Sequence, residues 1–189
     1  GASAVTDAYL VSRTIPTVIF SFISAGIGTG FIPLYSRILR DRGQAQADKY
    51  TNNLSNALLL MASIVVVIVI LFTQSIVRLF ASGFSGDTLT LAIAFTRISV
   101  SGVYFTALLN IFTGYLRIHE NYIVPALIGL PMNFTVIISL IASTKTNIYV
   151  MAIGSVIATA SQLVFLIPFM RNKGYKYQPI LDLKDENLK

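Results

Sequence analysis

Five apolar stretches, each long enough to cross a lipid bilayer, follow one another in this sequence of 189 residues. A transmembrane helix needs about 20 mainly apolar residues to span the hydrocarbon core. Because 54% of all residues are hydrophobic, a soluble domain of this size would lack the polar surface to cover such a core. The pattern predicts an all-α fold, a polytopic transmembrane helix bundle. The predicted helices cover residues 8–38, 54–72, 89–115, 123–143 and 148–170.

The basic residues alternate between the loops and predict how the chain is oriented. Ten of them lie in the loop 37–50, the loop 116–122 and the C-terminal tail, whereas the other two loops hold Arg78 and Lys145. Basic residues resist export, so the first three segments are predicted to be cytoplasmic in a multi-pass protein of the cell (plasma) membrane. Counting back places Gly1 outside the cell. Since the sequence shows no signal peptide, we expect that an earlier transmembrane helix is missing and that the chain is a fragment.

Composition and the single histidine argue against an enzyme. The sequence has no cysteine, which removes disulfides, thiolate metal sites and cysteine nucleophiles. Its net charge of +6 is explained by the cytoplasmic loops and their attraction to anionic lipid headgroups, so we expect no nucleic-acid partner. His119 lies beside Glu120 in a short loop, where neither a zinc-protease motif nor a serine–histidine–carboxylate triad can be built. We predict no catalytic residue, no metal site and no cofactor.

A stripe of polar residues runs along the first apolar stretch. On a helix these residues fall within an arc of roughly 120°. The threonines and serines either line a water-facing cavity or bond to neighbouring helices, and both interpretations stay open. For the charged residues the cavity is favoured, because ionisable groups inside a membrane are costly unless they have a function. Asp7, near the outer end, could also be solvated or cap the helix. The stripe consists of Asp7, Arg13, Thr14, Thr17, Ser21, Ser24 and Gly28.

Further features predict either a cavity or helix packing. Arg97 is the other charge within an apolar stretch, and it either lines a cavity or extends to the outer membrane surface. Gly26 and Gly30 lie four residues apart and predict the close approach of a second helix. Three polar residues share one face of the last stretch and predict hydrogen bonds between helices: Ser155, Thr159 and Gln162.

Four motifs lie along the chain in a characteristic order and spacing. They are GASAVTDAYLVSRTIP at residues 1–16, GFIPLYSRI at 30–38, FASGF at 80–84 and NYIVPALIGLPMN at 121–133. With them the sequence resembles the MurJ (MviN-type) lipid II flippases, in particular their Gram-positive-like members. That family belongs to the MOP superfamily, together with MATE drug exporters and polysaccharide flippases.

The resemblance implies a fold of two six-helix lobes around a central cavity. Residues 1–172 would then be most of the transmembrane N-lobe, without the start of its first helix. Residues 173–189 would be a polar cytoplasmic segment that leads to a missing second lobe. The implied function is the flipping of the undecaprenyl-diphosphate-linked peptidoglycan precursor, lipid II, across the cytoplasmic membrane by alternating access. The implied partners are lipid II or a similar polyprenyl-diphosphate glycolipid, membrane lipids and the protein's own C-terminal lobe.

The resemblance carries over to the candidate residues only in part. Asp7 is the aspartate of the TDA motif, and Arg97 stands where family members often have lysine or arginine. The basic pair that many members have after the motif's proline would fall at Phe20 and Ser21, so this chain lacks it. We hypothesise that Arg13 takes the place of that pair. The candidate substrate-binding or cavity-lining residues are Asp7, Arg13, Thr14, Thr17, Ser21 and Arg97.

Three alternatives to a lipid II flippase stay open from the sequence. The first is a related exporter of another lipid-linked oligosaccharide or polysaccharide, or of drugs, which the missing basic pair favours. The second is a membrane-embedded glycosyl- or acyltransferase that uses His119 and Glu120. The third is a non-transporting scaffold, in which the polar stripe would be packed away from water.

Overall fold

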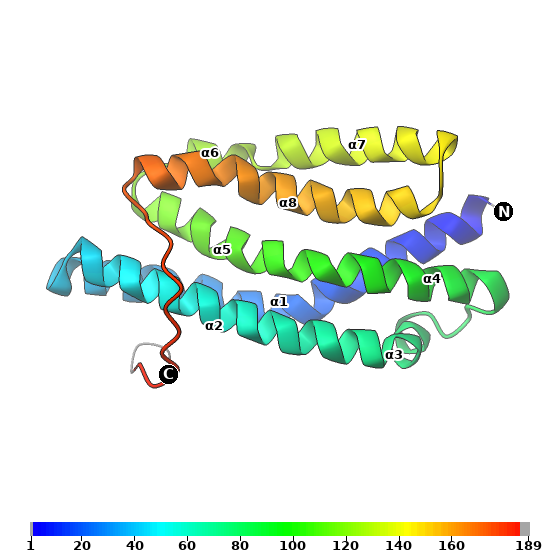
Figure 1. The fold of residues 1–189 in the computed structure, drawn as a ribbon, viewed down its shortest axis with the longest axis horizontal. Helices are drawn as coiled ribbons and strands as arrows, with labels where there is room; N and C mark the ends of the chain where they lie inside the picture. The colour runs from blue at the N-terminus through cyan, green and yellow to red at the C-terminus, as the bar shows by residue number, and fades with distance from the viewer. Residues whose placement is uncertain (1, 186–189) are drawn as a thin grey trace.

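The structure, a computed structural model, describes residues 2–185, without the side chains of residues 2–3, 22–24 and 26–28. The described chain is a bundle of helices that lie side by side, which confirms the predicted all-α class (Figure 1). Gly1, which was expected outside the cell, lies outside the described residues. The elements are α1 (Ala2–Arg42), α2 (Gln44–Leu71), α3 (Thr73–Phe80), α4 (Gly86–Ser99), the 3-10 turn η1 (Val100–Gly102), α5 (Val103–Ile118), α6 (Ile123–Leu127), α7 (Gly129–Lys145) and α8 (Tyr149–Asn172).

Four helical segments of the described chain are long and apolar enough to cross a membrane. Two are the single helices α2 and α8, and two are composite: α4 with η1 and α5, and α6 with α7. The first predicted stretch, 8–38, lies inside α1, which includes side chains that are not described. The short helix α3 was not predicted, because its eight residues are too few to give a clear periodic pattern.

Proline explains why one predicted helix is divided in two. The N–H that would bond to the Leu127 carbonyl belongs to residue 131, and Pro131 has none. The helix α6 ends at Leu127, and α7 begins two residues later at Gly129. By contrast, Pro168 lies inside α8 without ending it.

Glycine allows close helix contact at two places in the bundle. A Cβ added to Gly154 of α8 would overlap the Ser139 side chain of α7, so these helices touch where the glycine lies. A Cβ on Gly114 of α5 would come 3.0 Å from the Phe31 ring of α1. At Gly30 a Cβ would meet nothing within 4 Å, so the contact predicted there is not seen. The bulky neighbour Phe31 makes the α1–α5 contact instead, and Gly26 lies outside the residues with described side chains.

The core of the bundle has two clusters of buried side chains. The larger one joins α1, α2, α5 and α8 around Tyr35, Tyr115 and Leu166, each fully buried. The smaller one joins α1, α3, α4 and α8 around Ile15 and Phe95, which are also fully buried. Inside a membrane such contacts hold helices together by close packing, since lipid tails are as apolar as the side chains.

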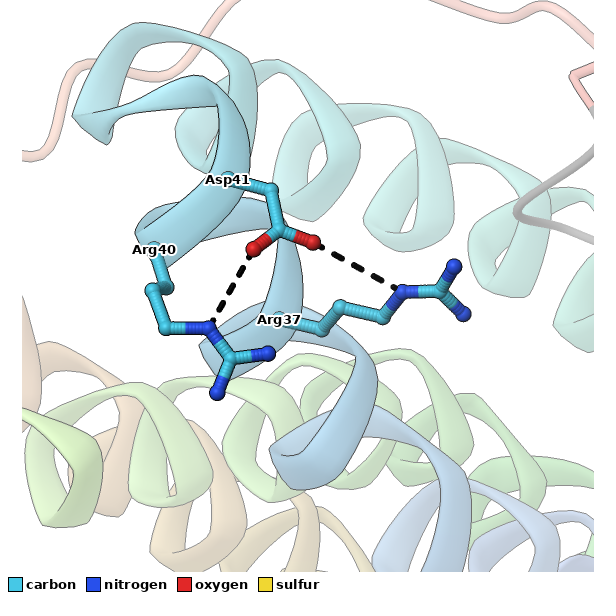
Figure 2. Close-up of polar contacts among 3 residues, drawn as sticks. All are labelled: Arg37, Arg40 and Asp41. Carbon is cyan, nitrogen blue, oxygen red and sulfur yellow. Dashed lines mark hydrogen bonds and ion pairs between the residues drawn. The ribbon is translucent and has the colours of Figure 1, made fainter.

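The three segments that were predicted to be cytoplasmic lie at one end of the bundle (Figure 1). We call it the basic end; it comprises residues 37–50, 116–122 and 171–185. Gln44 Nε2 donates a hydrogen bond to the Tyr115 hydroxyl at 3.1 Å, which joins the first segment to the end of α5. At the tip of α1, Arg37 and Arg40 both pair with Asp41 (Figure 2).

After α8 the chain crosses the first half of α2 as a strap, residues 175–185, which is neither helix nor strand and has a turn at residues 183–184 (Figure 1). The side-chain amide of Asn52 donates to the Lys176 carbonyl at 3.1 Å and accepts from the Gln178 N–H at 3.1 Å. Asn53 pairs in the same way with both backbone groups of Asp182. These amides replace the neighbouring strand that an extended chain would otherwise need.

The first residue of the strap is anchored inside the bundle. Tyr175 is 6% exposed, and its hydroxyl donates to Asn52 Oδ1 at 2.8 Å. Burial raises the pKa of the Tyr175 phenol above its ordinary value, so the hydroxyl keeps its proton and remains a donor. The Tyr175 ring also packs edge-on against Phe112 and Tyr115 of α5.

Candidate functional site

A polar cavity of about 280 Å³ lies between α1, the α4–α5 segment and α8. Its wall is mostly made of hydroxyl-bearing, amide and small side chains, together with one arginine. Because the α4–α5 segment and α8 are long and apolar enough to cross a membrane, such a polar wall would be costly if it faced hydrocarbon. The lining residues are Arg13, Pro16, Thr17, Phe20, Ser21, Ser99, Gly102, Val103, Thr106, Asn110, Ser155, Val156 and Thr159.

The α1 side of the cavity carries three of the predicted site residues. Arg13, Thr17 and Ser21 are spaced four residues apart, which places them on one face of the helix. Arg13 donates one hydrogen bond to the Tyr9 hydroxyl at 3.5 Å, and its guanidinium lies 5.8 Å from the centre of the Tyr9 ring. In the described part of the chain no carboxylate lies within ion-pairing distance of Arg13. Most of its donors are therefore available to a ligand.

The facing walls come from two other helical segments. Ser155 and Thr159 each donate to a carbonyl of α8, and Thr106 donates to the Gly102 carbonyl of η1, at 2.7–3.2 Å. Their oxygen lone pairs remain available as acceptors. Ser99 is only 7% exposed, and its Oγ has no hydrogen-bond partner among the residues that the structure describes. An unpaired buried hydroxyl at the wall of a polar cavity is suited to a ligand or a water molecule.

The remaining candidates lie away from this cavity. Asp7 and Thr14 are exposed, and Thr14 donates to the Leu10 carbonyl at 2.9 Å. Arg97 is exposed too, and its Nε donates to Thr73 Oγ1 at 3.4 Å, on the side of α4 that faces α3. The role predicted for these three residues therefore stays a prediction. Ser24 and Gly28 of the polar stripe lie outside the residues with described side chains.

Sequence reasoning missed or misread several cavity residues. Ser99, Thr106 and Asn110 were not singled out, although their spacing of seven and four residues is that of one helix face. Ser155 and Thr159 were expected to bond to other helices, but they bond within α8 and line the cavity. Their partner in that prediction, Gln162, does bond to another segment: its Nε2 donates to the Ile128 carbonyl at 3.1 Å.

The cavity's chemistry is that of binding. Arg13 supplies the positive charge, and hydroxyls and one amide supply directional hydrogen bonds, a combination suited to a polar or anionic group. The described residues contain no group of three potential metal ligands. His119 lies at the basic end, stacked on Tyr115 with the ring centres 4.2 Å apart, and its Nδ1 lies 2.9 Å from the Tyr115 carbonyl oxygen. These contacts indicate a structural role for the His119 imidazole.

Known proteins resemble this chain in sequence and fold. The family model "Lipid II flippase MurJ" matches residues 1–189. The lipid II flippase MurJ of Thermosipho africanus is 29% identical over 160 residues, covering 84% of this chain and 33% of the relative. The probable lipid II flippase MurJ of Buchnera aphidicola subsp. Baizongia pistaciae is 23% identical over 178 residues, covering 91% of this chain and 35% of the relative.

A solved structure has a similar fold. It is described as "Lipid II flippase MurJ, inward closed conformation" and matches with a TM-score of 0.79 and 26% identity, covering 94% of this chain and 38% of that chain. This chain thus spans about a third of the length of the curated relatives it matches. It therefore belongs to the MurJ family of lipid II flippases, multi-pass membrane proteins that are transporters and not enzymes.

Proposed function

We propose that the full-length protein flips lipid II, the undecaprenyl-diphosphate-linked peptidoglycan precursor, across the cytoplasmic membrane by alternating access. The observation that carries this proposal is the family match over residues 1–189, supported by the structural likeness at a TM-score of 0.79. In this proposal residues 1–172 are the N-lobe, and residues 173–189 lead toward a second lobe. The transferase alternative is set aside, because the family is one of transporters.

In this proposal the polar cavity is the N-lobe's share of the substrate pathway. Arg13 would bind the diphosphate through charge-assisted hydrogen bonds, which are about twice as strong as neutral ones. The positions where the basic pair is missing, Phe20 and Ser21, line the same cavity as Arg13. That shared location supports the hypothesis that Arg13 takes the place of the pair. Asp7 and Thr14, exposed in this chain, would face a cavity shared with the second lobe, and Arg97 would act nearer the outer surface.

We further propose that the basic end faces the cytoplasm. The three segments 37–50, 116–122 and 171–185 lie together there (Figure 1). Arg78 and Lys145, by contrast, belong to segments at the opposite end of the bundle. Segments rich in lysine and arginine are retained on the cytoplasmic side during membrane insertion. The cavity would then take up its substrate from the inner leaflet.

A second candidate is a related exporter of another lipid-linked glycan or of a drug. The observation that favours it is the single charge of the cavity: Arg13 is the only charged residue among the described lining residues. A cargo with less negative charge than a diphosphate would suit such a wall. The depletion experiment described next distinguishes a lipid II flippase from such an exporter.

The experiment depletes the full-length protein in its host and adds a lipid II-cleaving toxin from outside. If the protein flips lipid II, the amount of headgroup accessible to the toxin falls sharply and the precursor accumulates inside. Unchanged accessibility would contradict the lipid II proposal and favour another cargo. Re-expression of the wild-type protein is the control, and it should restore accessibility.

A further inference from the structure

A second and larger cavity lies on another side of the bundle, between α2, α5, α8 and the strap. It is an open groove of about 730 Å³, within the range of about 300–1,000 Å³ that small-molecule sites occupy. Its walls along the helices are apolar and consist of Leu59, Leu108, Phe112, Leu163, Ile167 and Met170. Except for Arg171, the helical part of the lining has no charged or strongly polar side chain among the described residues. We call it the apolar groove.

The groove extends from the apolar part of the helices to the basic end. Leu59, Leu108 and Leu163 belong to three different segments that are long and apolar enough to cross a membrane. The other end is lined by Arg171 in the last turn of α8 and by Lys176 in the strap. An occupant that fits both parts has a long hydrocarbon chain and an anionic group at one end.

No carboxylate of residues 2–185 neutralises the two basic side chains. In the described range neither Arg171 nor Lys176 forms an ion pair. The contrast is with Arg37 and Arg40, at the same end of the bundle, which both pair with Asp41 (Figure 2). Basic residues that line a groove between transmembrane helices, without an acidic partner, are suited to a lipid phosphate.

The strap gives the groove a fixed wall. Residues 174–177 line the groove, and the neighbouring backbone is held by Asn52. Tyr177 donates its hydroxyl to Asn56 Oδ1, so its side chain is held as well. Tyr175 packs against Phe112, another wall residue. A wall that is already in place loses little conformational freedom when a ligand binds.

We propose that the apolar groove binds an anionic glycerophospholipid of the leaflet at the basic end. One acyl chain lies between α2, α5 and α8, and the phosphate lies between Arg171 and Lys176. This site is separate from the polar cavity, which is lined by other residues and takes the transported substrate in the proposed function. Lipid binding in the apolar groove does not depend on which cargo is transported.

The test is photocrosslinking in vesicles of equal parts phosphatidylglycerol and phosphatidylcholine. The full-length protein carries a benzophenone amino acid at Ile167, a wall residue, or at Val164, which is 64% exposed on the same helix. Mass spectrometry then identifies the attached lipid. We expect adducts at Ile167 to be enriched in phosphatidylglycerol over those at Val164. Each basic residue should contribute about five-fold to that enrichment.

Charge variants complete the test. Arg171→Gln and Lys176→Gln should each lower the enrichment at Ile167 about five-fold, and the double variant should abolish it. The matched control is Arg40→Gln, which removes one charge at the same end but outside the groove, and it should change nothing. The thermal unfolding midpoint of each variant shows that the protein is still folded.

Three outcomes would overturn the proposal. Equal proportions of the two lipids at Ile167 and Val164 would make the groove an ordinary lipid-facing surface. A polyprenyl adduct at Ile167 would assign the groove to the substrate's tail. The absence of any lipid adduct at Ile167 would show that the groove is covered by protein in the full-length molecule. Because the enrichment is measured in the otherwise unchanged protein first, a variant that fails to fold does not prevent a decision.

Discussion

The polar cavity and the apolar groove are built partly from the same helices, yet their walls differ in almost every respect. The first has about 280 Å³ and one arginine among hydroxyls; the second has about 730 Å³ and a hydrocarbon wall with a basic rim. On α5 the two are separated by face: Thr106 and Asn110 line the cavity, and Leu108 and Phe112, each two positions later, line the groove. Two positions are about 200° on a helix, so the pairs point in opposite directions.

On α8 the two sites are separated both along and around the helix axis. Ser155, Thr159, Leu163 and Ile167 follow one another at intervals of four residues, and each is rotated about 40° from the one before, so Ser155 and Ile167 lie about 120° apart around the helix. The first two line the polar cavity, and the last two line the apolar groove. The change from hydroxyl to hydrocarbon side chains, between Thr159 and Leu163, marks the boundary between the two sites. The difference between the sites thus resides in a few side chains and not in the backbone.

The largest expected effect comes from removing the charge of the polar cavity. Arg13→Ala in the full-length protein should lower the toxin-accessible lipid II at least tenfold, since a hydrogen bond to a charged group contributes about 1.5–3 kcal/mol. Arg13→Lys should keep part of the activity, because it keeps the charge. Val18→Ala, on the same helix but outside the cavity lining, serves as control. Full transport by Arg13→Ala would refute the role proposed for Arg13.

The second-largest effect is expected in the reactivity of cysteines placed in the polar cavity, which reports its access to water. In a cysteine-free background, Thr17→Cys and Ser21→Cys should react readily with a water-soluble thiol reagent, because both positions are exposed and line the polar cavity. Ile167→Cys in the groove should react slowly, since lipid occupies it. Ile15→Cys, at a fully buried position of α1, sets the background rate. Thr17 and Ser21 cysteines that stay unreactive would favour the scaffold alternative.

A smaller effect is expected where α8 touches α7. Gly154→Ala would place a methyl group onto the Ser139 side chain, and overpacking of this kind costs about 1–3 kcal/mol. Because α8 lines both sites, the variant should disturb both, while its thermal unfolding midpoint falls. The matched control is Gly30→Ala, where a Cβ meets nothing within 4 Å and alanine should be neutral or stabilising. An unchanged midpoint for Gly154→Ala would show that the two helices can separate without cost.

The smallest effect concerns the strap alone. Asn53→Ala removes the hydrogen bonds to both backbone groups of Asp182, each contributing about 1 kcal/mol. Hydrogen exchange should become faster at the Asp182 amide, while the Gln178 amide, held by Asn52, changes little. Equal acceleration at both amides would show that the strap detaches as one unit. Cysteine labelling in the polar cavity should be unaffected.

Sequence patterns predicted the parts of this molecule that depend on a single helix. The apolar stretches indicated the bundle, and the four-residue spacing of Arg13, Thr17 and Ser21 indicated that they share a face. The facing wall could not be predicted, because periodicity identifies a face but not the helix that meets it. The hydrogen bond from Arg97 to Thr73 could not be predicted either, because it joins α4 to the first residue of another helix, α3. The polar tail had no pattern that indicated an ordered strap.

The strap also has an evolutionary consequence. The asparagines of α2 bind mainly its backbone, at the carbonyls of Lys176, Gln178, Ile180 and Asp182 and at two of the amide groups. Most side chains of this segment could therefore change without altering the course of the chain, provided that Asn52, Asn53 and Asn56 stay in place. The asparagines that determine the path of the strap lie more than a hundred positions before it in the sequence. These asparagines and the strap residues should therefore tolerate mutation to very different degrees.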